Sequence, residues 1–209
     1  MQNPPIGWFF APSARNTRTD DAMDIWTSHG SCVASKAVGR TYGVSKKSNL
    51  IVLKVTYAIE DLMWALFTTH KNVLDNNRQK RSVITFAFAT AEPAEDDHAA
   101  LRMKEIMGYL FDIDAVIVVP AGNYANSYST EFDRAPGIWE DRNFPLIVVG
   151  AASPNGLSYP PSQDGNHLLT TAPGYSVQCA LKDGGFTLTS GTSPATALVI
   201  SLLGFHEAE

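Results

Sequence analysis

Short apolar runs alternate with segments of helical periodicity along this chain, and this alternation restricts the fold more than any other feature. Apolar residues recur three and four positions apart over Ile59–Leu74 and Leu101–Leu110, which predicts two helices. Strands that alternate with helices form a mainly parallel sheet covered on both faces. The sequence therefore predicts an α/β fold, a three-layer sandwich. Its main strands are expected at Leu50–Val55, Ser82–Phe88, Ala115–Pro120 and Leu146–Gly150.

Further elements are expected around this core within one domain, residues 1–209, because no repeat or linker divides the chain. A helix is predicted over Ser28–Val38, and a last helix from Pro194 has no charged residue as far as Phe205, which predicts that it is buried. The first two dozen residues are expected to be extended or loop. Short late strands are expected at Leu168–Ala172, Val177–Ala180 and Phe186–Thr189.

Composition excludes several classes of partner. A net charge of -5 and a pI near 5.5 give no basic surface for nucleic acid. The longest apolar run, Ala115–Pro120, is too short to cross a membrane. No cysteines or histidines have the spacing of a metal site, so neither a metal nor another cofactor is expected. The first residues, MQNPPI, lack the pattern of a signal peptide, and the localisation stays undetermined.

The chain has two cysteines, Cys32 and Cys179. They could form one bridge or remain as buried thiols. We expect the second alternative, because Cys32 lies on a predicted helix and Cys179 on a late strand. Two free thiols are therefore predicted.

Three polar residues are expected at one edge of the predicted sheet, the edge formed by the carboxyl ends of its strands. His29 opens a helix, and its ordinary pKa suits a general base. Asn123 follows the strand that ends at Pro120 and carries two amide donors. Ser193 stands at the start of the last helix, whose dipole favours negative charge there. Taken singly, each has an ordinary explanation as a capping or turn residue, but their common placement predicts that the three converge.

Several blocks of the sequence, in order, resemble the subtilisin-like serine peptidases (subtilases). SHGSCVASKAVG is similar to the family's His-Gly-Thr-His-Val-Ala block, and VIVVPAGNYAN to the block with the oxyanion asparagine. FPLIVVGAASPNG and TTAPGYSVQCA resemble a later strand and an Ala-Pro-Gly turn. SGTSPATALV resembles the nucleophile block, Gly-Thr-Ser-X-Ala. The resemblance extends from about Thr27 to Gly204.

This resemblance implies a serine endopeptidase of the peptidase S8/S53 type, in a family whose members are often secreted. Ser193 would attack the scissile carbonyl and form an acyl-enzyme, with His29 as the general base. The Asn123 amide and the Ser193 backbone N–H would form the oxyanion hole. The loop after Phe86 would offer a backbone edge to an extended peptide or protein substrate. We expect the protein to be a monomer.

One part of the family pattern is not found. The family's third catalytic residue is an aspartate in an Asp-Ser/Thr-Gly turn that ends the first core strand, and the 28 residues before His29 contain no such pattern. Asp20, Asp21 and Asp24 lie close to His29 in the sequence, and none of them is assigned this role. We therefore expect a truncated subtilase that lacks this strand and part of the carboxyl terminus, and hydrolyses peptides poorly or not at all.

Two other functions stay open. A non-catalytic subtilase-like module could bind extended peptides or a protein partner in the same cleft, and the missing aspartate favours this alternative. A nucleotide-binding α/β domain would bind phosphate at the turn after Pro120. No G-x-G-x-x-G or P-loop pattern follows a predicted strand, which argues against nucleotide binding.

Overall fold

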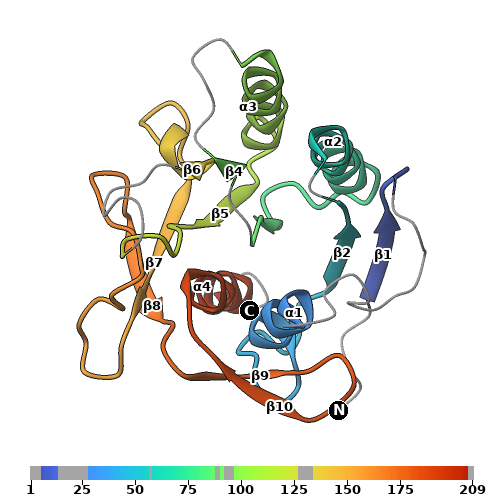
Figure 1. Ribbon diagram of the computed structural model, residues 1–209. Helices are drawn as coiled ribbons and strands as arrows, with labels where there is room; N and C mark the ends of the chain where they lie inside the picture. Colours follow the sequence, from blue (N-terminus) through green and yellow to red (C-terminus); the bar gives the residue numbers. More distant parts are fainter. Residues whose placement is uncertain are drawn as a thin grey trace.

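The computed structural model describes residues 6–13, 28–56, 58–87, 90–91, 97–126 and 134–206. Its helices lie in two layers with parallel strands between them (Figure 1). One layer holds α2 (Ile59–Asp75) and α3 (His98–Phe111), and the other holds α1 (His29–Val38) and α4 (Thr192–His206). The predicted α/β class, a three-layer sandwich, is confirmed.

The largest sheet has four parallel strands in the order β3-β5-β7-β8. They are β3 (Val83–Thr85), β5 (Val116–Pro120), β7 (Ile147–Ala152) and β8 (Thr170–Pro173). β1 (Ile6–Phe10) and β2 (Leu50–Lys54) form a separate parallel pair. Two antiparallel pairs complete the described strands: β9 (Val177–Ala180) with β10 (Phe186–Thr189), and β4 (Thr90–Ala91) with β6 (Arg134–Ala135).

β1 adds a pairing that was not predicted. The start of the chain was expected to be extended or loop, and Ile6–Phe10 is extended and pairs with β2 from Leu50 to Lys54. Gly7 and the prolines before it weaken the strand signal, but the consecutive aromatic residues Trp8, Phe9 and Phe10 favour a strand. Pairing with an apolar neighbour therefore decides the conformation of a run that is ambiguous by itself.

The core follows the alternation of side chains along β5. Ile117 and Val119 face the layer of α2 and α3, where they pack in one buried cluster with Leu66 and Ile106. Val118 belongs to a second cluster with residues of α4. The two clusters hold the helix layers on opposite faces of the sheet. Because β5 and β7 are parallel neighbours, their carboxyl ends lie at the same edge of the sheet.

α4 begins at Thr192, two residues before the predicted start at Pro194. A proline is tolerated in the first turn of a helix because its missing N–H would have no acceptor there. Residues 192–197 are buried, as predicted, whereas Leu202 near the other end is 52% exposed. No helix in the described ranges is both long and apolar enough to cross a membrane.

A disulfide joins Cys32 to Cys179, so the prediction of two free thiols was wrong. The helix and the strand that were thought to keep the thiols apart are neighbours, because α1 packs against β9. The Ala180 N–H donates to the Ser35 hydroxyl at 3.0 Å, and the two Cα atoms of the bridge are 4.7 Å apart. The bridge links residues 147 positions apart and fixes the first turn of α1 to the late hairpin.

Candidate active site

Ser193 is the second residue of α4 and is 8% exposed. The N–H groups in the first turn of a helix have no acceptor within the helix, and the dipole there favours negative charge. The Ser193 hydroxyl donates to the carbonyl oxygen of Ala87, which follows β3, at 3.2 Å. The serine thus stands at the edge of the sheet with its backbone N–H in an anion-favouring position.

Asn123 lies directly against the start of α4. The Thr192 N–H donates to Asn123 Oδ1 at 2.8 Å, which fixes the carbonyl arm of the amide. The Asn123 Nδ2 group is the other arm, and it carries two donors. The structure therefore brings an exposed amide donor next to Ser193, at the place where the sequence predicted convergence.

Two glycines allow this close approach. Gly191 has a φ of 150°, and a Cβ there would lie 3.3 Å from both polar atoms of the Asn123 amide. The Gly191 N–H donates to the Gly174 carbonyl oxygen at 2.7 Å, and a Cβ on Gly174 would lie 2.6 Å from the Gly191 oxygen. The Ala-Pro-Gly turn thus supports the serine turn by backbone contact. Neither glycine was predicted as a site residue, although both stand in the quoted family blocks.

Thr192 connects the asparagine turn to the helix. Its hydroxyl oxygen accepts from the Gly122 N–H at 3.3 Å, and its carbonyl oxygen accepts from the Thr196 hydroxyl at 2.9 Å. Thr192 is fully buried, so these bonds are shielded from water. This threonine therefore positions the Asn123 turn.

His29 begins α1 and is exposed. Ser28 before it has a left-handed φ of 50°, and its hydroxyl oxygen accepts from the Lys182 N–H at 3.2 Å. Gly30 and Ala87 line one cavity, so the residue beside His29 and the residue bonded to Ser193 border the same space. The catalytic roles of His29, Asn123 and Ser193 stay predictions.

Other candidate groups were considered at this edge. Asp20, Asp21 and Asp24 lie outside the described residues. Across the described part of the chain, no three histidine, cysteine, aspartate or glutamate residues group so that they could hold a metal ion. The described residues at this edge supply a hydroxyl, an imidazole and amide donors.

Asp61 is a buried carboxylate that the sequence did not single out, although an acidic residue in the first turn of an apolar helix is a usable signal. It is 3% exposed and accepts from the Thr56 N–H at 3.0 Å, the Thr56 hydroxyl at 2.8 Å and the Ser13 hydroxyl. Burial raises the pKa of Asp61, but these hydrogen bonds outweigh it and the pKa is lowered. Asp61 therefore joins the chain after β1 to the chain after β2.

We expect Asp61→Ala to lower the free energy of unfolding by about 1–3 kcal/mol at neutral pH, because the half-buried Thr56 N–H loses its acceptor. The folded pKa lies below the unfolded value, so the stabilisation is present above the unfolded pKa, near 4. It is lost as the pH falls through the folded pKa. Urea unfolding of both proteins at pH 7 and at acid pH should show the difference shrinking. A difference that does not change with pH would contradict the ionised role of Asp61.

Comparisons with known proteins agree with this geometry. The sequence model described as the subtilase family matches residues 2–205. Subtilisin-like protease 2 of Trichophyton rubrum is 28% identical over 187 residues, which cover 85% of this chain and 40% of the relative. The same protein of Trichophyton tonsurans is 27% identical with the same coverage. The chain thus spans about two fifths of the length of these relatives.

Solved structures show the same fold. A cold-adapted subtilisin-like serine proteinase superposes with a TM-score of 0.72 at 18% identity, covering 98% of this chain and 75% of that one. The prenylagaramide maturation protease PagA gives a TM-score of 0.71 at 19% identity, covering 98% and 70%. At these identities the likeness concerns the fold.

Proposed function

Because this chain belongs to the subtilase family, we propose that it is a serine endopeptidase that cleaves peptide bonds through an acyl-enzyme on Ser193. The observation that supports this most is the Asn123 amide, held by the Thr192 N–H beside the first turn of α4. An amide donor and a helix N–H at one serine suit the developing negative charge of acyl transfer.

The reaction follows from these groups. Ser193 Oγ attacks the carbonyl carbon of the scissile bond, and its proton passes to the His29 imidazole. The negative oxygen of the tetrahedral intermediate accepts hydrogen bonds from the Ser193 N–H and Asn123 Nδ2. The carbon–nitrogen bond then breaks, and the amine leaves with the proton from His29. Water, deprotonated by His29, hydrolyses the ester and restores the serine.

A second function is favoured by one contact. The Ser193 hydroxyl donates to the Ala87 carbonyl, so in this structure its proton is directed to the backbone. A module that binds extended peptides without cleaving them would retain this arrangement. Binding of a peptide by a protein whose Ser193 does not react with a fluorophosphonate, even slowly, would support that alternative.

Asn123→Ala tests the proposed oxyanion hole. We expect the rate at which a fluorophosphonate labels Ser193, and any peptide hydrolysis, to fall by about 10²–10³, the effect of losing one oxyanion donor. Asn123→Asp keeps an acceptor for the Thr192 N–H but replaces the donor with a charge, so it should lose at least as much while preserving the fold. Asn126→Ala changes an exposed asparagine nearby and should have no effect. Equal labelling of all the proteins would contradict the role of Asn123.

A further inference from the structure

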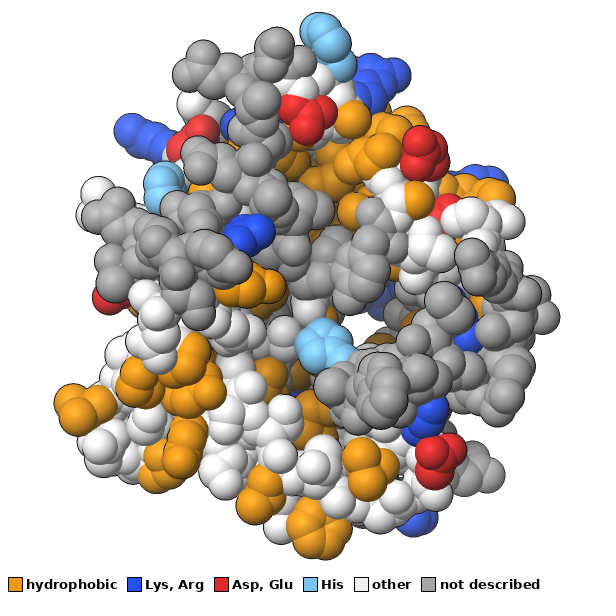
Figure 2. All heavy atoms as spheres, viewed as in Figure 1, with side chains coloured by type: hydrophobic (Ala, Val, Ile, Leu, Met, Phe, Trp, Pro, Cys, Tyr) orange, Lys and Arg blue, Asp and Glu red, His pale blue; other side chains and the backbone are white. Residues whose placement is uncertain are grey.

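Acidic and basic side chains are scattered over the face of the molecule in Figure 2, and the described residues form no patch of one charge there. The polar side chains that stand out are buried. In the part of the chain that the structure describes, the largest fully buried side chains are apolar except Gln163 and Thr192. Buried amides are normally held by specific contacts, and Gln163 makes such contacts with the turn that carries Asn123.

The backbone around Gln163 bonds to this turn on both sides of Asn123. The Gln163 N–H donates to the Gly122 carbonyl oxygen at 3.0 Å. The Ala125 N–H donates in the other direction, to the Pro161 carbonyl oxygen, at 3.2 Å. The residue before the asparagine and the second residue after it are therefore tied to the same short segment.

The side chain of Gln163 packs against the turn as well. A Cβ on Gly122 would lie 2.2 Å from Gln163 Oε1 and 3.2 Å from its Cδ, so the amide lies directly against the Gly122 Cα. Gln163 is 1% exposed, and its side chain fills an interior position. A shorter side chain would leave a space beside Gly122 into which the turn could move.

The start of α4 holds the remaining polar groups of the turn. The Gly122 N–H donates to the Thr192 hydroxyl oxygen at 3.3 Å, and the Thr192 N–H donates to Asn123 Oδ1 at 2.8 Å. Both backbone polar groups of Gly122 are thus fixed, the N–H by Thr192 and the carbonyl oxygen by Gln163. The direction of the Asn123 amide depends on this glycine being held at both ends.

The segment that carries Gln163 is anchored to the central sheet. The Ser162 hydroxyl oxygen accepts from the Ala151 N–H of β7 at 3.0 Å, and the Ser162 N–H donates to the Tyr159 carbonyl oxygen at 2.7 Å. β7 pairs with β5, and the asparagine turn follows β5 directly. Gln163 therefore connects the end of one strand to the turn that follows its neighbour.

We propose that Gln163 is a positioning residue of the oxyanion hole, whose side chain fixes the peptide at Gly122 and thereby the direction of the Asn123 Nδ2 donor. This role rests on the peptidase activity proposed above. An oxyanion donor must lie about 2.7–3.1 Å from the negative oxygen, and a displacement of about 1 Å can lower a rate by about 10². Because Gln163 is buried, it acts through Asn123 and not on the substrate.

Replacing Gln163 tests this role. We expect Gln163→Ala to slow the labelling of Ser193 by a fluorophosphonate by about 10–10²-fold, and by no more than Asn123→Ala does. Gln163→Asn keeps a buried amide but is one methylene shorter, so it withdraws the amide from Gly122 and should cause a similar loss with less change in stability. Asn166→Ala alters an exposed asparagine three residues further on and should have no effect.

A double-mutant cycle separates positioning from a general loss of stability. In the Asn123→Ala protein the donor is already absent, so adding Gln163→Ala should slow labelling by less than about twofold more. A merely structural role would lower labelling by the same factor in both proteins. Urea unfolding of each variant measures its stability independently.

Amide hydrogen exchange gives a second measurement, one that needs no reaction at Ser193. The Thr192 N–H is protected by Asn123 Oδ1, so Gln163→Ala should speed its exchange by at least about tenfold. Exchange at Val118 should stay unchanged, because the pairing of β5 with its neighbours does not involve Gln163. Asn166→Ala should alter neither amide.

The outcomes distinguish the role of Gln163 from the proposed activity. Labelling that Asn123→Ala slows and Gln163→Ala does not would overturn the role of Gln163 and leave the activity standing. An equal loss in both backgrounds, or unchanged exchange at Thr192, would overturn the role as well. Labelling that Asn123→Ala does not slow would contradict the oxyanion hole itself. If Ser193 is not labelled in any of the proteins, exchange at Thr192 decides whether Gln163 holds the turn.

Discussion

Replacing Ser193 by alanine is expected to abolish labelling by a fluorophosphonate and to remove any peptide hydrolysis that passes through an acyl-enzyme, a loss of about 10² in kcat where no carboxylate supports His29. The reason is that the other groups of the site only assist this hydroxyl. Ser190→Ala is the matched control, since it removes an exposed hydroxyl just before the same helix, and with it the hydrogen bond that this hydroxyl accepts from the Ser176 N–H. Labelling is measured by intact-protein mass spectrometry over time, and that of the unaltered protein is expected to be slow.

Two outcomes would change this interpretation. Labelling that survives Ser193→Ala would place the nucleophile elsewhere. Full peptidase rates that disappear with Ser193→Ala would mean that a carboxylate already supports His29, and the expectation of a weakly active enzyme would be wrong. Asp20, Asp21 and Asp24 would then be the first residues to mutate.

Local patterns predicted most of the fold. The helix predicted over Ile59–Leu74 is α2, Ile59–Asp75, because its apolar face repeats over four turns. The strand predicted over Ala115–Pro120 is β5, Val116–Pro120, because a short apolar run between turns has few alternatives. The strand expected at Ser82–Phe88 is shorter, Val83–Thr85, and it is the strand whose second edge has no described partner. The sequence pattern therefore predicts the length of an element best where other elements pack against it on all sides.

Contacts between distant segments could not be predicted in this way. The Cys32–Cys179 bridge depends on α1 lying beside β9, and no local pattern reports which late strand crosses an early helix. The separation of β2 from β3 is likewise a matter of tertiary order, since each strand has an ordinary apolar sequence.

At the candidate site, too, the sequence indicated single residues but not the contacts between them. The block SGTSPATALV indicated Ser193, but the Thr192–Asn123 hydrogen bond and the Gly174–Gly191 contact join residues far apart in the sequence. Asp61 was missed because its partners, Ser13 and Thr56, belong to two different strand ends. The sequence blocks therefore identified the candidate residues, whereas the contacts that position these residues could be seen only in the fold.

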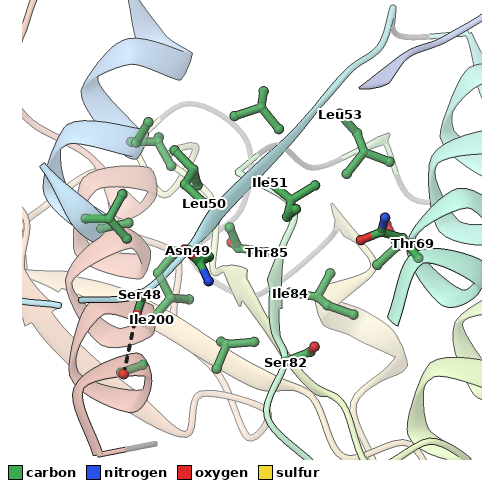
Figure 3. Close-up of a pocket in the computed structure, with 18 of the residues that line it drawn as sticks. Ser48, Asn49, Leu50, Ile51, Leu53, Thr69, Ser82, Ile84, Thr85 and Ile200 are labelled. Carbon is green, nitrogen blue, oxygen red and sulfur yellow. Dashed lines mark hydrogen bonds between the residues drawn. The ribbon is translucent and has the colours of Figure 1, made fainter. Parts of the chain in front are cut away.

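A cavity of about 700 Å³ between β2 and β3 leads to the other large expected effect (Figure 3). It is lined by Gly30, which follows His29, and by Ala87, whose carbonyl oxygen accepts from Ser193. A synthetic peptide of five apolar residues followed by an aspartate, bound in this cavity parallel to β2 and β3, would present a carboxylate to His29. That carboxylate would orient the imidazole and stabilise its protonated form.

We expect this peptide to raise the rate of fluorophosphonate labelling of Ser193 by about 10⁴, the share of such an aspartate in triad catalysis. The same peptide with asparagine is the control, because it binds as a strand without a charge. Equal acceleration by both peptides would mean that filling the cavity orders the site and that the carboxylate adds nothing. Binding of both peptides without acceleration would mean that the strand does not deliver its carboxylate to His29, or that another carboxylate already serves it. His29→Ala should remove the difference between the two peptides, because the aspartate acts only through the imidazole.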